Sequence, residues 1–460
     1  MMKFIGREKE MASFEALAGL KSPSLVVIRG RRRIGKSRLA SECGKGRVFI
    51  PFSGLAPEKK VTAQDQRDAF AYQLSRHFKL PLMTFHNWSD AFYALEHYLT
   101  SEPTLILFDE ISWMGEEDPT FIGKLKIWWD AIATQDRPWI LILCGSVSTW
   151  IEENVIQNTA LFGRISLKID LQPLSLPECG QFIKEIGFKG TGLEMYKLLA
   201  VMGGVPWYLR HIHSEQMAEE NIERLCFATG GLFVDEFKKI FHDLFNTRGT
   251  LHQKIIHALA DGMKTLKEIR EAADLADSGV ISTGIEDLII AGFVTKHAQW
   301  SLKTKKQAKQ ALYRLSDCFL RFHVKYIASG MKPSEGGYGF QVESLLLQNR
   351  ALLCKAIGIS SQDIVADNPY LQRPTKSRKG CQVDYLIQTT TNNLFLCEFK
   401  FHNREVGCEV IEEMEKKIKS LAIPRGYAAV PVLFHIGGVS PSLEERRYFY
   451  RIIDMHRFLT

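Results

Sequence analysis

Unbroken apolar runs in the first 150 residues predict the strands of a parallel sheet. They are Leu25–Ile28, Leu105–Phe108 and the segment WILILC that ends at Cys144. Strands that helices cover on both faces form continuous apolar runs, whereas half-exposed strands alternate. Helix-compatible segments separate these runs, so we expect an α/β core over residues 1–174.

Helical periodicity replaces this pattern in the middle of the chain. Residues 175–247 predict an α-helical lid, and residues 248–327 predict a winged helix-turn-helix. In the latter, three periodic segments precede two strand-like stretches, GFVTKHAQW and ALYRLSD, which would form the wing. The loop between them is basic and would suit a phosphate backbone, but the third helix offers no arginine to read bases. The pattern therefore favours a packing or regulatory role for this module over sequence-specific reading of DNA.

Alternating positions mark residues 328–460 as a second α/β domain. In LFLCEFKF, Leu394, Leu396, Glu398 and Lys400 share one face of a strand. The other face would be apolar and buried. A hairpin that turns at 389–393 would bring Asp384 of VDYLI alongside Glu398 and Lys400, and the helical segment EVIEEMEKKIKSL would pack behind the sheet.

Length and composition describe a folded, multi-domain chain. At 460 residues, with 45% hydrophobic and 24% charged residues, it exceeds the size of one core. It has no run of about 18 apolar residues, and its nine cysteines lack paired spacing. We therefore expect a cytoplasmic protein without a membrane partner. The net charge of +7 mildly favours an anionic partner.

A phosphate-binding loop follows the first apolar run. Residues 30–37 fit GxxxxGK[ST], in which backbone amides surround phosphate, Lys36 reaches the β- and γ-phosphates and Ser37 ligates Mg²⁺. The expected cofactors are ATP and Mg²⁺. The loop and the start of its helix supply the predicted nucleotide-binding residues Gly30, Arg31, Arg32, Arg33, Ile34, Gly35, Lys36, Ser37 and Arg38. The three consecutive arginines could add positive potential, sense a partner's acidic surface, or form a solvated tip.

Two carboxylates end the second apolar run. Asp109 is placed to hold magnesium, and Glu110 to polarise the attacking water. Ser146 ends a further strand, where it would sense the γ-phosphate or merely close the strand. Arg164 could act as an arginine finger, in its own chain or toward a neighbouring subunit, and a surface salt bridge is the equal alternative.

The segments FIGREKEMASFEAL, GRRRIGKS, LILFDE, LCGS and GGVPWYL together resemble the AAA-related group often called archaeal ATPases, which is related to the STAND class. This resemblance covers about the first 330 residues. It implies that Phe4, Ile5, Gly6 and Arg7 lie against the adenine. It also implies that residues 204–206, which include Pro206, close over the base from a helical lid.

The charged hairpin is similar to the PD-(D/E)xK nuclease core. Adjacent carboxylates at Asp384 and Glu398 repel unless a cation lies between them, and Lys400 could orient or deprotonate a water. The resemblance adds Glu343 as a further acidic ligand, for Mg²⁺ or Mn²⁺, and assigns Lys376, Arg378 and Lys379 to a nucleic-acid backbone. Val383 stands where the motif has proline. The alternative is a Glu398–Lys400 pair on a solvent-facing strand.

These patterns predict an ATP-hydrolysing protein whose C-terminal domain is a metal-dependent nuclease acting on DNA or other nucleic acid. A signalling ATPase, related to the STAND class, is the second hypothesis. Under this hypothesis, homo-oligomerisation would depend on which nucleotide is bound, and the C-terminal domain would only bind a partner. A DNA-binding regulator that acts through the winged helix is the third.

Overall fold

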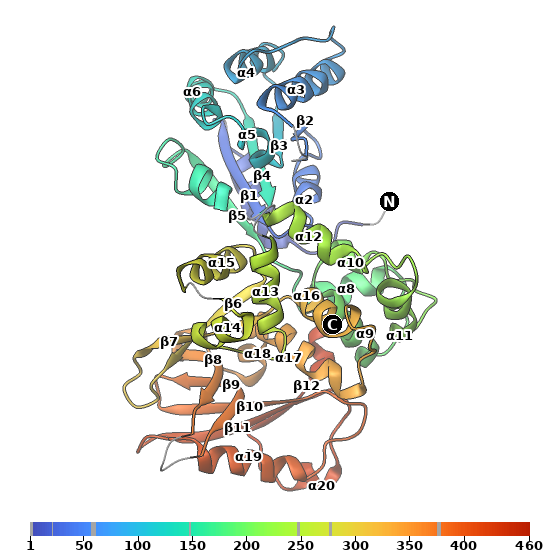
Figure 1. Ribbon diagram of the computed structural model, residues 1–460, viewed down its shortest axis with the longest axis vertical. Coiled ribbons are helices and arrows are strands. Elements are labelled where there is room, and N and C mark those ends of the chain that lie inside the picture. Colours follow the sequence, from blue (N-terminus) through green and yellow to red (C-terminus); the bar gives the residue numbers. More distant parts are fainter. Residues whose placement is uncertain are drawn as a thin grey trace. The chain divides into compact units, whose positions relative to one another are not determined.

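A five-stranded parallel sheet forms the centre of the N-terminal part of the computed structural model (Figure 1). In spatial order, its strands are β2 Val48–Ser53, β3 Thr104–Asp109, β4 Trp139–Ser146, β1 Ser24–Gly30 and β5 Ile165–Leu171. Strand β4 thus separates β1 from β3, and Gly30 pairs with Ser146. The predicted parallel α/β core is confirmed.

The structure describes residues 3–20, 22–56, 61–146, 149–245, 249–275, 278–374 and 379–460. The chain divides into two compact units. The first comprises Met1–Pro173, Val205–Trp207 and Ile290–Gly292, and the second comprises Leu174–Gly204, Tyr208–Ile289 and Phe293–Thr460. The predicted boundaries of four domains remain predictions. In the described ranges, no helix is long and apolar enough to cross a membrane.

Aromatic rings fill the core of the first unit. Phe52 stacks on Phe70 with ring centroids 4.2 Å apart, and Phe92 stacks on Phe108 at 5.9 Å. Such pairs contribute about 0.5–1.5 kcal/mol each beyond the burial of their area. The helices of this unit are α1 Glu8–Ala18, α2 Lys36–Cys43, α3 Ala63–Phe78, α4 Trp88–His97, α5 Ile111–Gly115, α6 Phe121–Ala133 and α7 Thr149–Ile151, followed by a π-helix, Glu152–Ile156.

The second unit begins with helices, as the periodicity predicts. The carboxylate of Glu178 accepts hydrogen bonds from the backbone and hydroxyl of Ser175, both at 2.7 Å, and so closes the first turn of α8. The helices are α8 Leu176–Glu185, α9 Gly192–Met202, α11 Ala218–Ile222 and α12 Glu236–Phe245, with a π-helix at Glu223–Phe227. A short helix, α10 Pro206–Leu209, starts on the two residues that belong to the first unit.

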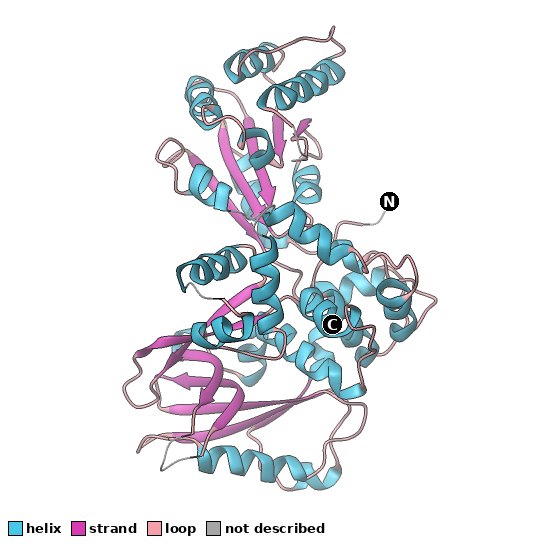
Figure 2. Cartoon of the chain, in the orientation of Figure 1, coloured by secondary structure: helices cyan, strands magenta, loops and turns pink. Residues whose placement is uncertain are grey.

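Three further helices precede a two-stranded antiparallel ribbon, in the predicted order (Figure 2). They are α13 Gly249–Leu259, α14 Leu266–Ala273 and α15 Ser278–Ile290, and the strands are β6 Val294–Trp300 and β7 Gln307–Leu315. The ribbon packs on the C-terminal sheet. In this contact, the indole Nε1 of Trp300 in β6 donates a 2.6 Å hydrogen bond to Oε1 of Gln388, which lies in the next region of the chain. Assignment as a winged helix remains a prediction.

The C-terminal sheet has the order β12-β11-β10-β9-β8. Its first three strands along the chain pair antiparallel, and the last three pair parallel. The strands are β8 Ile364–Gln372, β9 Cys381–Thr389, β10 Asn393–Lys400, β11 Ala428–His435 and β12 Arg451–Asp454. The helices of this region are α16 Cys318–Phe322, α17 Gly339–Gln348, α18 Arg350–Ile357, α19 Glu409–Ser420 and α20 Pro441–Glu445.

The end of the chain packs back onto the helices that open the second unit. The hydroxyl of Tyr196 in α9 donates a 3.0 Å hydrogen bond to the carbonyl of Met455. A Cβ at Gly180 in α8 would lie 2.0 Å from the carbonyl oxygen of Leu459, so only glycine fits there. The predicted lid helices and the C-terminal α/β region therefore belong to one compact unit.

Candidate functional site

The loop between β1 and α2 has the backbone geometry of an anion-binding cradle. Arg33 and Gly35 adopt positive φ angles of 67° and 95°, which turn the chain sharply before Lys36 opens the helix. A Cβ at Gly30 would lie 2.6 Å from the carbonyl oxygen of Leu171, so the first glycine is required for packing. Free amides at a helix start bind phosphate.

Lys36 is buried at the mouth of this loop, where 5% of the residue is exposed. Its ammonium donates to the carbonyl oxygens of Gly30 at 3.2 Å and Arg31 at 3.3 Å. It also donates to the hydroxyl of Ser146 at 3.3 Å. The insertion of β4 between β1 and β3 therefore brings the predicted phosphate-binding lysine and the predicted sensor serine together.

The two carboxylates follow β3 on the same edge of the sheet. Oδ1 of Asp109 accepts a 3.1 Å hydrogen bond from the backbone N–H of Glu110. Glu110 itself has a positive φ of 50°. Burial raises the pKa of Glu110, while the charge of Lys36 opposes that rise. Oε2 of Glu110 is buried and has no hydrogen-bond partner among the described residues. A buried acceptor of this kind fits a water or a hydrated Mg²⁺.

Two segments distant in sequence lie on the loop. Nη2 of Arg7 donates a 3.3 Å hydrogen bond to the carbonyl of Ile34, and Gly6 just before it has a φ of 71°. A Cβ at Gly35 would lie 3.9 Å from Cγ of Pro206. The structure thus brings together the loop, the Gly6–Arg7 segment and Pro206, all of which the sequence assigns to the nucleotide.

The sequence does not identify Trp207 as part of this site. The guanidinium of Arg33 lies over its indole, 3.4 Å from the ring centroid. The available signal is an aromatic residue directly after Pro206 in GGVPWYL. Arg31, Arg32 and Arg33 are half-buried, which distinguishes them from a solvated tip, whereas Ser37 and Arg38 are exposed.

Arg164 forms the salt bridge that the sequence left as an alternative. Its Nε and Nη2 donate to the two carboxylate oxygens of Asp130 at 2.5 and 2.9 Å. Lys126 approaches the same carboxylate at 2.8 Å. Hydrogen bonds from Arg164 and Lys126 lower the pKa of Asp130 to about 2. A role for Arg164 as an arginine finger remains a prediction.

In the C-terminal sheet, the hairpin of β9 and β10 forms with the predicted pairing. Oδ2 of Asp384 accepts a 3.1 Å hydrogen bond from the backbone of Phe399, next to Glu398. Burial first, and the charge of Glu398 second, raise the pKa of Asp384 to about 7. Glu343 of α17 is close enough to contribute to that rise, although its carboxylate pairs with Arg314 at 2.8 Å.

The cation at these carboxylates is a lysine that the sequence analysis did not single out. Lys417 forms an ion pair with Oε2 of Glu398, and its Nζ lies 3.9 Å from Oδ1 of Asp384. Lys400 lies 3.4 Å from Glu398 and 2.5 Å from Glu413. Helix α19 therefore covers the carboxylate-bearing face of the sheet, and its predicted place behind the sheet is wrong.

A divalent metal does not fit this cluster as it is arranged. The part of the chain that the structure describes contains no group of three or more His, Cys, Asp or Glu side chains arranged for a metal ion. Metal binding by Asp384, Glu398 and Glu343 remains a prediction, as does catalysis by Lys400. Of the predicted basic approach, Lys376 and Arg378 lie outside the described residues, and Lys379 is exposed.

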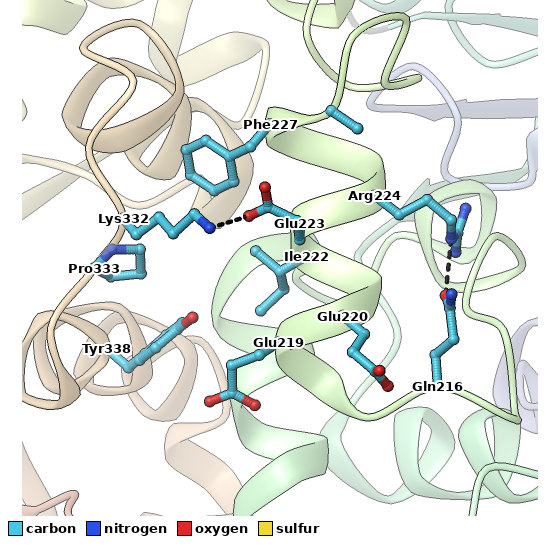
Figure 3. Close-up of a pocket in the computed structure, with 11 residues that line it drawn as sticks. Gln216, Glu219, Glu220, Ile222, Glu223, Arg224, Phe227, Lys332, Pro333 and Tyr338 are labelled. Atoms are coloured by element: carbon cyan, nitrogen blue, oxygen red, sulfur yellow. Dashed lines mark hydrogen bonds and ion pairs between the residues drawn. The ribbon is translucent and has the colours of Figure 1, made fainter.

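A cavity of about 540 Å³ in the second unit contains none of the predicted site residues (Figure 3). Two pairs cross its wall: Lys332 with Glu223 at 2.8 Å, and Arg224 with Gln216 at 2.9 Å. It is lined by Gln216, Glu219, Glu220, Ile222, Glu223, Arg224, Phe227, Ala228, Lys332, Pro333 and Tyr338. Its acidic side chains are paired or exposed, so the cavity offers no convergent set of groups for catalysis.

Comparison with known proteins bears on the first of these sites. Residues 4–212 match the family described as an ATPase domain predominantly from Archaea. The N-terminal part of the chain contains an archaeal-type ATPase domain. This ATPase domain includes the loop at Lys36, the carboxylates at 109–110, Ser146 and the segment at Pro206.

Relatives extend over more of the chain. The uncharacterized protein MJECL04 of Methanocaldococcus jannaschii is 23% identical over 348 residues, which cover 74% of this chain and 72% of that protein. The Walker-type ATPase PABY2304 of Pyrococcus abyssi is similar in structure, with a TM-score of 0.50 and 17% identity, covering 70% of this chain and 96% of that one. The second comparison supports the fold alone.

Proposed function

We propose that the ATPase domain binds ATP with Mg²⁺ and hydrolyses it. The observation that carries this proposal is the convergence of Lys36, Ser146 and the buried, unpaired Oε2 of Glu110 at one edge of the sheet. Lys36 and the loop amides would bind the β- and γ-phosphates, and its contact with Ser146 would register the terminal phosphate. Magnesium, held by Ser37 and Asp109, would neutralise charge on the phosphates.

Glu110 is the residue that we assign to water activation. A general base works best when its pKa approaches the working pH, and burial raises the pKa of this carboxyl. The neighbouring carboxylate of Asp109 also contributes to this rise in the pKa of Glu110. Arg7 and Pro206 would border the base, since Arg7 donates a hydrogen bond to the loop and Pro206 lies beside Gly35.

The test compares ATP hydrolysis by Lys36→Ala, Glu110→Gln and Lys45→Ala, the last an exposed control just beyond the C-terminal end of α2. We expect Lys36→Ala to lose ATP binding, because it removes the cation that faces the phosphates. Glu110→Gln should keep ATP binding and lose hydrolysis by at least about a hundredfold. Wild-type turnover in Glu110→Gln would contradict the role of Glu110.

A second candidate function is phosphodiester cleavage in the C-terminal sheet. The hairpin brings Asp384, Glu398 and Lys400 together, which is the observation that favours it. If a divalent metal replaces the Lys417 ammonium at these carboxylates, plasmid and linear DNA, with Mg²⁺ or Mn²⁺ and with or without ATP, should be cut by the wild type and not by Lys400→Ala. If the two proteins behave identically, a regulatory ATPase whose C-terminal domain only binds a partner is favoured. Sedimentation in the presence of ATP and of ADP would then show whether the protein forms a homo-oligomer that depends on the nucleotide.

A further inference from the structure

Helix α19 carries one lysine within its apolar face. Val410, Met414 and Leu421 are buried, with at most 5% of each residue exposed. Lys417 lies three residues after Met414 and four before Leu421, the spacing that places side chains on one helix face. Its side chain is 23% exposed, against 77% for Lys419 two residues on. The fold therefore directs the Lys417 ammonium toward the sheet.

Two carboxylates receive this ammonium. Glu398, whose side chain is 8% exposed, forms the ion pair, and Asp384, at 18%, lies 3.9 Å from the same nitrogen. Carboxylates this close would repel each other without a positive charge between them. Removing one partner of a buried pair leaves an uncompensated charge and is strongly destabilising. Lys417 thus supplies a positive charge that offsets the repulsion between the two carboxylates.

Lys400 gives the same cluster a second internal cation. Its ammonium lies 3.4 Å from Oε1 of Glu398 and 2.5 Å from Oε2 of Glu413 on α19. Each carboxylate oxygen of Glu398 therefore faces a different lysine. A hard divalent cation needs several free oxygen ligands, and these oxygens already have partners.

We propose that Lys417 is a built-in counter-ion, which occupies the place of a divalent cation between Asp384 and Glu398 and keeps Mg²⁺ and Mn²⁺ out. The ammonium must withdraw before a metal can bind. The proposal concerns the site of the second candidate function, but it does not depend on cleavage. It explains why the pair of acids is tolerated in the described structure without a metal-binding arrangement.

Mn²⁺ binding to the nucleotide-free, full-length protein tests the proposal, with free Mn²⁺ measured by electron paramagnetic resonance. Lys417→Met removes the charge and keeps the length of the side chain. We expect this variant to bind one Mn²⁺ per chain more than the wild type, at least about tenfold more tightly than any wild-type binding there. Lys416→Met, a change at an exposed position of the same helix, should behave as the wild type.

A double variant shows whether the additional Mn²⁺ binds at Asp384 and Glu398. Lys417→Met with Glu398→Gln should lose the additional Mn²⁺, whereas a binding site elsewhere in the chain would survive this change. The proposal is overturned if wild type and Lys417→Met bind Mn²⁺ equally, or if the additional Mn²⁺ persists in the double variant.

Thermal unfolding keeps the test decisive if Lys417→Met is unstable. Mn²⁺ should raise the Tm of Lys417→Met, since a ligand stabilises the state that binds it, and leave that of Lys417→Arg unchanged. Equal shifts in both variants would refute the counter-ion role. Cleavage of DNA is measured separately. If Lys417→Met gains a Mn²⁺ but cuts no DNA, the proposed nuclease activity is rejected and the counter-ion role stands. If the wild type already binds Mn²⁺ at this site and Glu398→Gln abolishes that binding, the counter-ion role is rejected and the nuclease proposal stands.

Discussion

The guanidinium of Arg33 lies 3.4 Å from the ring centroid of Trp207. Arg33 is a non-glycine residue held at a φ of 67°, a conformation that costs free energy unless other contacts stabilise it. Trp207 belongs to a three-residue segment of the first unit, whose chain neighbours Gly204 and Tyr208 belong to the second. The stack therefore connects the phosphate-binding loop to the point at which the chain passes between the units.

We expect Trp207→Ala to weaken ATP binding. The stack contributes about 0.5–2 kcal/mol, so its loss should raise the Kd for ATP by about 2- to 30-fold. Binding of a fluorescent ATP analogue measures the effect. Trp207→Phe keeps an aromatic face over Arg33 and should retain most of the affinity. An unchanged Kd in Trp207→Ala would show that the loop keeps its shape without the stack.

Arg164 and Asp130 should behave as a pair. Their side chains are 30% and 37% exposed, and ion pairs in contact with solvent contribute little to stability. We expect Arg164→Ala and Asp130→Asn to leave kcat for ATP within about twofold of the wild type, because each removes the same contact. If Arg164→Ala alone abolishes hydrolysis while Asp130→Asn is active, Arg164 is an arginine finger and the ion pair is only its resting contact.

Local patterns predict the strands and the loop on which the N-terminal site is built. The continuous runs before Gly30 and Asp109 predict the buried strands, and the loop motif places Lys36 directly after one of them. The carboxyl ends of parallel strands meet at one edge of the sheet. The contact between Lys36 and Ser146 adds information that these motifs lack, because it depends on β4 lying between β1 and β3.

Tertiary contacts account for what the sequence did not reveal. The period-two pattern correctly pairs Asp384 with Glu398, but it contains no information about what covers that face. The stripe formed by Val410, Met414, Lys417 and Leu421 is the available signal for the covering helix. A single lysine in such a stripe is easily taken for a solvated residue, since lysine commonly extends its head group to water.

Lysines in the β6–β7 loop and at the start of β7 provide a test of nucleic-acid binding. Lys303, Lys306 and Lys309 are exposed, whereas Lys305 donates a 3.2 Å hydrogen bond to Oδ1 of Asn392. If the loop follows a phosphate backbone, each contact contributes about 0.9 to the slope of log K against log salt. Changing these three exposed lysines to glutamine should then lower that slope by about 2–3.

Fluorescence anisotropy with duplex DNA at several salt concentrations measures the slope. Lys419→Gln, at an exposed position of α19, is the control and should change it by no more than one phosphate contact. A slope that is the same in the triple variant and the wild type would exclude the β6–β7 loop as a backbone contact and leave it a packing element.

His297 should make the second unit sensitive to acid. It is 2% exposed in β6, and its Nδ1 lies 3.0 Å from Oδ1 of Asn368 in β8, so it links the ribbon to the C-terminal sheet. Burial, reinforced by the charges of Arg350 and Arg314, lowers its pKa from 6.5 to about 4. Between these two values the unfolded chain binds a proton that the folded protein excludes, so stability falls as the pH falls through this window.

At pH 5 this linkage costs about 2 kcal/mol relative to pH 7.5. We expect His297→Gln to be less stable than the wild type at pH 7.5, because it loses the packing of the ring, but to lose about 2 kcal/mol less on acidification. Urea unfolding at both pH values measures the difference. If His297→Gln and the wild type lose the same stability between the two pH values, folding does not lower the pKa of His297.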